Sequence, residues 1–132
     1  MKKRVLDTSV LLRWWNQCRS RERRALSAKS VTQWARRLIE THDTNGIVTP
    51  ILVEVVAGAT SARELRLLKE FLEPFQCIDG QRILADDWRE AIRLAQRIPR
   101  NGRPRDLSDC LIRAIADRLN HDVVTLDQGF PG

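Results

Sequence analysis

The chain has 132 residues, of which 42% are hydrophobic and 30% are charged. That composition is typical of a folded domain in water, and no apolar run approaches the ~20 residues needed to cross a bilayer. We therefore expect no membrane segment, and the length suits a single domain over residues 1–132. The formal net charge of +6 predicts a polyanionic partner, either nucleic acid or an anionic membrane surface.

The N-terminus and the cysteines indicate the cellular compartment in which the protein is expected. Met1–Arg4 resembles the start of a signal peptide, but Asp7 interrupts the apolar run that follows and no small-residue cleavage site comes after it. Cys18, Cys77 and Cys110 are widely spaced and odd in number, which favours reduced thiols over a disulfide framework. We expect a cytoplasmic protein.

The first half of the chain alternates short apolar runs with amphipathic stretches. In chain order, the predicted elements are a strand at 3–7, helices at 8–16 and 30–42, a strand at 47–49 and a helix at 50–59. Ser30 with Gln33 resembles a capping box, and Pro50 after Thr49 is typical of a helix start.

The second half continues the alternation. In chain order, the predicted elements are a helix from Ser61 that Pro74 stops, a strand at 75–78, a helix from Asp86 or Asp87 to about Ile98, a helix at 107–119 and a strand at 123–126. Asp106 is the predicted cap of the helix at 107–119. Short apolar strands joined by helices predict an α/β fold with a parallel sheet, and such sheets bind ligands at the carboxyl ends of their strands.

Basic residues gather in two places. The first group is Arg13, Arg19, Arg21, Arg23, Arg24, Lys29, Arg36 and Arg37, and the second is Arg97, Arg100, Arg103 and Arg105 around a loop at 99–104. Either group is a candidate surface for nucleic acid, and either could simply be solvated. Trp14, Trp15 and Trp34 lie in the first group and could stack on bases, although packing in a core or an interface is the more common role.

Four acids lie in apolar surroundings. Asp7 follows an apolar strand, Glu54 is the one charge in a helical apolar run, Asp109 shares a helix face with apolar residues, and Asp127 closes the last strand. Acidic side chains are rarely buried unless they are paired or bind metal. Taken one at a time, Asp7 could cap a helix, Asp109 could favour a helix dipole and Asp127 could belong to a turn.

A shared cause for the four acids is a site for one or two hard divalent cations. Mg²⁺ and Mn²⁺ prefer oxygen ligands, and the isolated His42 and His121 offer no zinc-like spacing. Carboxylates around such a cation can activate water against a phosphodiester. The sequence therefore predicts a basic surface that holds a polynucleotide and an acidic pocket that cuts it.

Four segments together resemble the motif blocks of PIN-domain proteins, and in particular the small VapC-type toxin ribonucleases. They are Val5–Leu11, Thr49–Gly58, Asp106–Ile112 and Val124–Phe130. The resemblance spans essentially the whole chain and implies a single PIN-like domain, with a parallel sheet of about five strands flanked by helices. Arg113 departs from the pattern, because the family more often has a small apolar residue there.

The resemblance also implies a function. Asp7, Glu54 and Asp109 match the family's three core acids and Asp127 its more variable fourth acid, while Thr8 or Ser9 and Thr125 fall where the family has supporting hydroxyls. It implies cleavage of RNA that depends on Mg²⁺ or Mn²⁺, a homodimer, and inhibition by a cognate antitoxin.

Two other functions compete with this interpretation. A non-catalytic PIN-like RNA-binding or regulatory protein would be expected to have lost a core acid, and none is lost here. A phosphotransfer domain on a similar sheet would need Asp-x-Asp after the first strand, or paired acids before it. The sequence Asp7-Thr8-Ser9 after Val5-Leu6 supplies neither.

Overall fold

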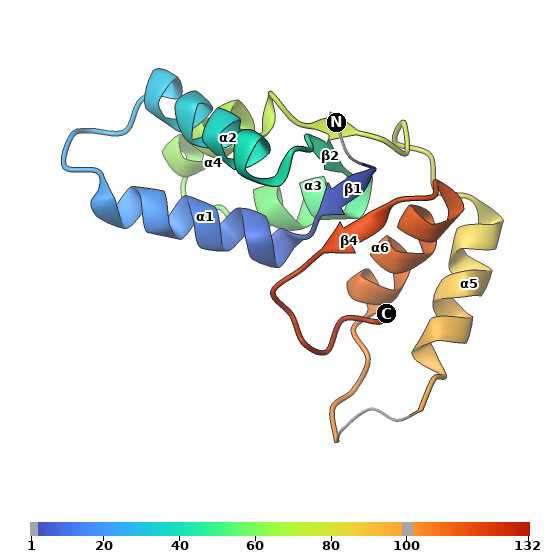
Figure 1. The fold of residues 1–132 in the computed structure, drawn as a ribbon. Helices are drawn as coiled ribbons and strands as arrows, with labels where there is room; N and C mark the ends of the chain where they lie inside the picture. The colour runs from blue at the N-terminus through green and yellow to red at the C-terminus, as the bar shows by residue number, and fades with distance from the viewer. Residues whose placement is uncertain (1–2, 99–101) are drawn as a thin grey trace.

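The computed structural model describes residues 3–98 and 102–132. Four strands and six helices alternate along that part of the chain (Figure 1). Their bounds are β1 Arg4–Leu6, α1 Thr8–Arg21, α2 Ala28–His42, β2 Gly46–Ile47, α3 Thr49–Ala57, α4 Ala62–Leu72, β3 Gln76–Cys77, α5 Ala85–Ala95, α6 Leu107–Arg118 and β4 Asp122–Val124. The predicted α/β class is confirmed.

The strands form one parallel sheet in the order β3-β2-β1-β4. The described residues hold four strands, as the apolar runs predicted, whereas the family resemblance implied about five. Gly46 of β2 pairs with Val5 of β1, and a Cβ at Gly46 would lie 2.9 Å from the Arg4 carbonyl oxygen, so this close strand contact requires glycine. Because all four strands run the same way, their carboxyl ends meet at one edge of the sheet.

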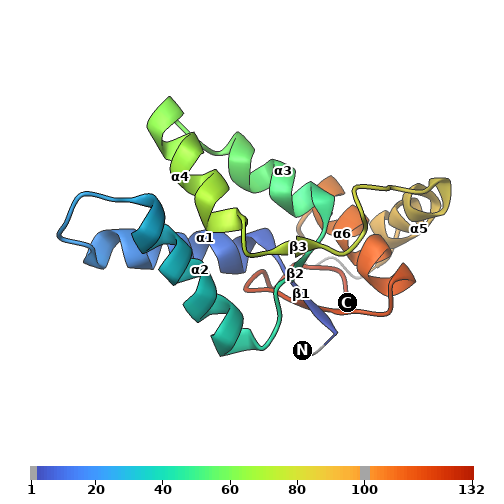
Figure 2. The same ribbon diagram turned by 90° about the horizontal axis from the view of Figure 1, so that it is seen from above.

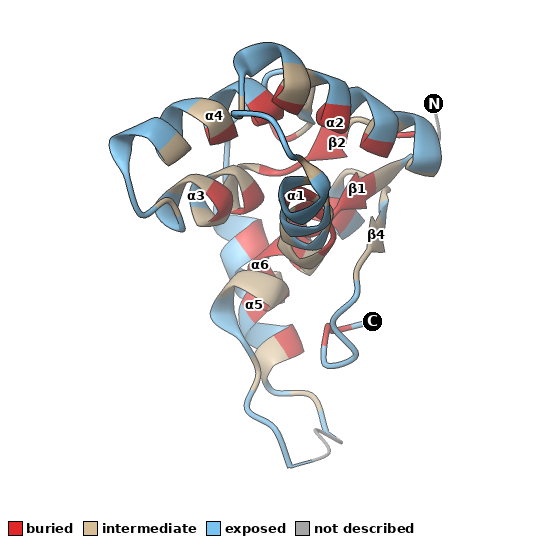
Figure 3. Cartoon of the chain, turned by 90° about the vertical axis from the view of Figure 1, so that its left-hand side faces the viewer, coloured by how far each residue is buried: buried red, intermediate tan, exposed pale blue. Residues whose placement is uncertain are grey.

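Helices pack on either side of the strands. α1, α2 and α4 lie on one side and α5 and α6 on the other, as two views at right angles show (Figures 1 and 2). Buried residues line the inward faces of these helices (Figure 3). Trp15 is the centre of an aromatic cluster, with ring centroids 5.5 Å from Trp34 and 5.3 Å from Phe71. Trp15 and Trp34 therefore serve the core rather than an RNA surface.

Several predicted boundaries were wrong by a few residues. The helix predicted at 8–16 continues to Arg21, and the helix predicted to reach Ile98 ends at Ala95. The capping box of α2 is formed by Ser27 and Ser30, not by Ser30 and Gln33, because the helix begins two residues earlier. Residues 99–101 of the predicted arginine-rich loop lie outside the described residues.

One buried ion pair ties α5 to α6. The Asp87 side chain is 1% exposed and accepts hydrogen bonds from Nε and Nη2 of Arg118, at 2.7 and 3.0 Å, and from the Leu84 N–H at 2.9 Å. Burial would raise the pKa of Asp87, but the bonds from Arg118 and Leu84 and the arginine charge outweigh it and lower the pKa. This carboxylate belongs to the fold and not to the candidate site.

Candidate active site

Asp7 lies where β1 passes into α1, at the carboxyl edge of the sheet. Its N–H donates to the Val124 carbonyl at 2.9 Å, so the backbone of β1 stays paired with β4 up to this residue. The side chain is 3% exposed and makes no capping hydrogen bond to α1, although the backbone is in the N-cap position. The helix-cap interpretation of Asp7 is therefore wrong.

Two hydroxyls point their protons at one oxygen of Asp7. Ser9 Oγ donates to Asp7 Oδ2 at 3.0 Å, and Thr125 Oγ1 donates to the same oxygen at 2.8 Å. Each hydroxyl in turn accepts a backbone N–H, from Leu126 and Asp127 respectively, both at 3.0 Å. Because those N–H groups occupy the hydroxyl lone pairs, the hydroxyl protons are directed at Oδ2. Asp7 Oδ1 accepts no hydrogen bond from the described residues.

Glu54 faces the same edge from α3. It is half-buried, and Thr8 Oγ1 donates to its Oε1 at 2.9 Å. Burial raises the pKa of Glu54, the Thr8 hydrogen bond opposes that rise, and the negative charges of Asp7 and Asp106 add to it. The raised pKa of Glu54 is therefore due mainly to burial, with a smaller contribution from the nearby charge of Asp7.

Asp109 brings α6 into the same region. Its backbone N–H donates to Asp106 Oδ1 at 3.2 Å, so Asp106 caps α6 as predicted. Burial, followed by a side-chain hydrogen bond with Asp127 and by the charges of Asp106, Asp7 and Asp127, raises the pKa of Asp109 to about 8. The helix dipole alone would favour the charged form, so the pKa is set by burial and the neighbouring acids and not by the helix end.

The side chain of Asp127 takes part in both a turn and the candidate site. Its Oδ1 accepts the Gly129 N–H at 2.8 Å, which makes the predicted turn, and the side chain also hydrogen-bonds to Asp109. This exposed residue can therefore form the turn and also belong to the candidate site. Asp106 was predicted only as a helix cap, but its negative charge also raises the pKa values of Glu54 and Asp109. The signal for that second role was its position three residues before Asp109.

A further buried acid holds α3 in place. Asp79, 6% exposed, follows β3 and accepts hydrogen bonds from the Thr49 N–H at 2.9 Å and from Thr49 Oγ1 at 2.8 Å. Thr49 begins α3, so Asp79 caps the helix that carries Glu54 from a position 30 residues later in the chain. No local sequence pattern predicts this hydrogen-bonded pair.

The comparisons with known proteins agree with this arrangement. The family model of the PIN domain matches residues 4–131, which is nearly the whole chain. The chain belongs to the PIN domain family. PIN domains are typically nucleases and generally bind divalent metal ions. Among curated proteins and solved structures, none matches the chain.

The side chains of this PIN domain suit a hard cation in their chemistry, since the four acids offer only oxygen atoms. Asp7 Oδ1 and Glu54 Oε2 accept no hydrogen bond from the described residues. As these residues are placed, no group of three or more acidic, histidine or cysteine side chains within residues 3–98 and 102–132 has the spacing of a metal site. A shared cation at Asp7, Glu54, Asp109 and Asp127 therefore stays a prediction.

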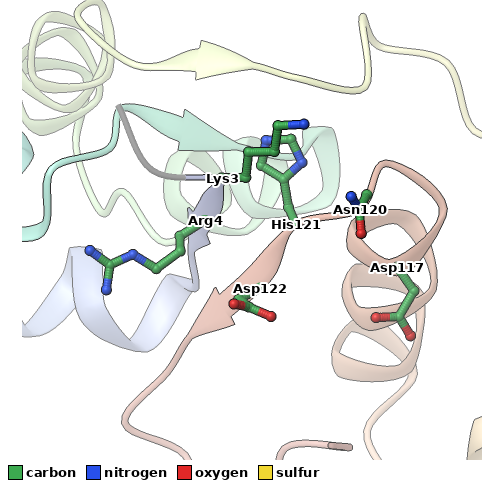
Figure 4. A pocket seen from close by; sticks show the side chains of 6 residues that line it. All are labelled: Lys3, Arg4, Asp117, Asn120, His121 and Asp122. Atoms are coloured by element: carbon green, nitrogen blue, oxygen red, sulfur yellow. The ribbon is translucent and has the colours of Figure 1, made fainter.

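A hollow of about 560 Å³ in this PIN domain is lined by residues other than the four candidate acids (Figure 4). Arg4 and Asp122, which line it, begin β1 and β4, so the hollow is at the amino edge of the sheet, opposite to Asp7. Its lining mixes basic and acidic side chains and contains none of the predicted site residues.

The raised pKa of Asp109 gives the PIN domain a predicted pH dependence in EDTA. The pKa of Asp109 is near 4 in the unfolded chain and about 8 in the folded one. At pH values between these two, the native state binds a proton that the unfolded state does not. The free energy of unfolding should therefore fall as the pH rises from 4 to 8, by about 1–3 kcal/mol after allowing for solvent around a half-buried group.

Asp109→Asn should remove this fall, so the variant should exceed the parent in stability most clearly above pH 8. Urea unfolding between pH 5 and pH 9 measures the difference. Parallel pH profiles for the two proteins would show that Asp109 is ionised in both states.

Proposed function

We propose that this PIN domain is an endoribonuclease that depends on Mg²⁺ or Mn²⁺ and that Asp7, Glu54, Asp109 and Asp127 hold the cation. The observation that carries the proposal is a nearly buried carboxylate, Asp7, beside two acids whose pKa values are raised. The five ion pairs of the described residues all use other acids. Acids that the fold gathers but does not neutralise are typical of a metal-binding site.

The residues around Asp7 prepare it for that role. Ser9 and Thr125 hold their protons against Oδ2 and keep the carboxylate in one rotamer, which leaves the lone pairs of Oδ1 for a ligand. Thr8 does the same for Glu54 through Oε1. A divalent cation, when bound, would polarise the phosphodiester and lower the pKa of its water. The net charge of +6 favours a polyanionic substrate in spite of the acidic pocket.

The role of a toxin in a type II toxin–antitoxin pair is part of this proposal and rests on the resemblance to VapC-type proteins. The toxin proposal also includes a cognate antitoxin, a homodimer and a cytoplasmic location. The thiols of Cys18 and Cys77 are free, which is consistent with that compartment. None of the described helices is long and apolar enough to span a membrane.

The test is cleavage of end-labelled single-stranded RNA by the purified chain, with a DNA strand of the same sequence beside it. We expect RNA fragments with Mg²⁺ or Mn²⁺ and none in excess EDTA. RNA binding without cleavage in either metal would favour a non-catalytic RNA-binding protein. Full cleavage in EDTA would contradict the metal mechanism. Co-expression with the product of a small neighbouring reading frame tests the antitoxin.

Arginines beside α6 are expected to bind RNA and not to cut it. Arg103 is exposed and Arg105 half-buried, and both lie just before the helix that carries Asp109. Changing both to alanine should weaken RNA binding and flatten its salt dependence, by roughly 0.7 in the log–log slope for each phosphate that the variant no longer neutralises. Cleavage at saturating RNA should change much less than the affinity.

Arg66 and Lys69, two exposed cations on α4, provide the matched double-alanine control. Fluorescence anisotropy between about 50 and 200 mM salt, a range over which phosphate binding weakens steeply, separates the variants. A salt slope unchanged in the Arg103 and Arg105 variant would move the RNA surface to the arginines between Arg13 and Arg24.

A further inference from the structure

Trp14 is only half-buried, unlike its neighbours Trp15 and Trp34, which are 3% exposed. Its Nε1–H donates to the Trp34 carbonyl oxygen at 2.9 Å, which fixes the indole ring by its edge. A hydrogen bond from Nε1 lies in the plane of the ring, so it occupies neither ring face. The aromatic ring contacts of the described residues do not include Trp14. The core therefore fixes Trp14 in position without fully covering it.

A hollow of about 340 Å³ opens beside Trp14, and we call it the α1–α2 hollow. It is lined by side chains from α1 and its C-cap and from α2: Trp14, Cys18, Arg21, Glu22, Trp34 and Arg37. Trp14, Cys18 and Arg21 are spaced four and three residues apart, so they lie on one face of α1. Sites for small ligands have volumes of roughly 300–1,000 Å³, so this hollow is large enough for a ligand the size of a nucleotide.

Two arginines give the α1–α2 hollow a positive charge. Arg21 and Arg37 are exposed, and the five ion pairs of the described residues include neither of them. Both act on the thiol of Cys18: burial raises its pKa, and the charges of Arg37 and Arg21 oppose that rise. Glu22 is the one acid in the lining, and its Oε1 accepts the Arg24 N–H at 3.0 Å. Two positive charges against one negative charge favour an anionic ligand.

An aromatic ring beside two guanidinium groups matches the two parts of a nucleotide. A base of any sequence can stack on an indole face, and an arginine can donate two parallel hydrogen bonds to a phosphate. The position along α1 also suits a strand that enters the acidic pocket. Trp14 lies two helical turns after Asp7, about 10 Å along the axis of α1. A single strand of RNA is long enough to reach both places.

We propose that the α1–α2 hollow binds one nucleotide of single-stranded RNA, with the base stacked on Trp14 and the phosphates paired with Arg21 and Arg37. The proposal rests on RNA as the substrate of the proposed function and gives that substrate a second contact outside the acidic pocket. This contact holds the strand and takes no part in the cleavage step, so it can be measured by binding alone.

Cys18 reports whether the α1–α2 hollow is occupied, because its side chain lines it. Iodoacetamide, a neutral reagent, should alkylate the free thiols of Cys18 and Cys77, which are both half-buried, and peptide mass spectrometry gives the two rates. The probe is a short single-stranded RNA, added in EDTA so that it stays intact. At about ten times its dissociation constant, the RNA should slow alkylation of Cys18 by about 10-fold and leave Cys77 in β3 unchanged.

The two arginines are tested by a double substitution. Arg21→Ala with Arg37→Ala should weaken RNA binding and lower its log–log salt slope by roughly 0.7 for each phosphate contact that is lost. Arg23→Ala with Arg36→Ala is the matched control, since both arginines are exposed, lie within two residues of the tested pair and do not line the α1–α2 hollow. The two double variants lose the same charge, so a difference between them reports the contact itself.

Trp14 is tested by two substitutions that differ in stacking. Trp14→Leu should weaken RNA binding by roughly 10-fold, because the base loses its stacking partner. Trp14→Phe keeps an aromatic ring and should bind nearly as tightly as the wild type. Both changes remove the hydrogen bond to the Trp34 carbonyl oxygen, so a loss caused by packing alone would be equal in the two variants. Far-ultraviolet circular dichroism verifies that each variant is folded.

Three results would overturn the proposal: equal alkylation of Cys18 with and without RNA, equal affinities of the two double-arginine variants, or protection of Cys18 by polyglutamate as strong as that by RNA. The last would assign the α1–α2 hollow to an acidic protein segment. These outcomes are separate from those of the nuclease assay. Protection of Cys18 by an RNA that stays intact in Mg²⁺ and Mn²⁺ would remove the ribonuclease and keep the nucleotide site, whereas cleavage without protection would do the reverse.

Discussion

Asp7→Asn should lower RNA cleavage by about 100-fold or more while leaving the fold intact, because the change removes one ligand charge from the pocket and misplaces the attacking water. An amide oxygen can still accept from Ser9 and Thr125, so the hydroxyl network that surrounds Asp7 survives. Removing one of several neighbouring negative charges also relieves repulsion, so thermal stability in EDTA should hold or rise.

Asp122→Asn is the control for that experiment. Asp122 begins β4 at the amino edge of the same sheet, opposite to Asp7, and is exposed. Its replacement should leave cleavage and Mn²⁺ affinity unchanged. Cleavage rates at saturating Mg²⁺, together with Mn²⁺ binding by isothermal titration, separate a lost ligand from a lost fold. Undiminished cleavage by Asp7→Asn would remove Asp7 from the mechanism.

The largest expected effect on stability is at the buried ion pair between α5 and α6. Arg118→Ala leaves the Asp87 carboxylate, 1% exposed, with only the Leu84 N–H as a donor among the described residues. An uncompensated buried charge costs about 3 kcal/mol or more, which for a chain of this size lowers the melting temperature by roughly 10 °C. The variant should recover partly at low pH, where Asp87 is protonated.

An exposed pair on the same helix provides the comparison. Arg93 pairs with Glu90 in water, so Arg93→Ala should change the free energy of unfolding far less than Arg118→Ala does. Urea unfolding at pH 7 measures both variants. Equal losses for Arg118→Ala and Arg93→Ala would show that the native state does not depend on the buried pair.

The sequence predicted the elements and their order because each depends on local pattern. The run Val5–Leu6 is followed by Asp7, and the structure has a strand ending at Leu6 with Asp7 at the sheet edge. Helix lengths were less accurate, since Cys18 packs partly against the core and extends α1 by a turn that local apolar spacing does not reveal. The strands are also shorter than the apolar runs that contain them.

For the candidate site, the resemblance implied the supporting hydroxyls of Thr8, Ser9 and Thr125, and the structure has them hydrogen-bonded to Glu54 and Asp7. Asp7, Glu54, Asp109 and Asp127 were chosen for their apolar neighbours, and the acids do influence one another's pKa values. Asp79 and Asp87 were missed as buried acids, because each is satisfied by a partner about 30 residues away in sequence. A hydrogen-bond partner that is distant in sequence produces no periodic pattern from which it could be predicted.

Because Asp79 caps α3, the position of this helix depends on the stability of the neighbouring strand β3. β3 is an outer strand with two paired residues, and Asp79 follows it directly. Short edge strands open at lower free energy than the centre of a sheet. If β3 detaches, the start of α3 loses its cap and Glu54 loses its alignment, although β3 itself lies apart from the acids. The position of Glu54 in the pocket then depends on how often β3 detaches from β2. Amide hydrogen exchange at Ile78 would measure the rate of that opening, since the Ile78 N–H donates to the Ile47 carbonyl across the two strands.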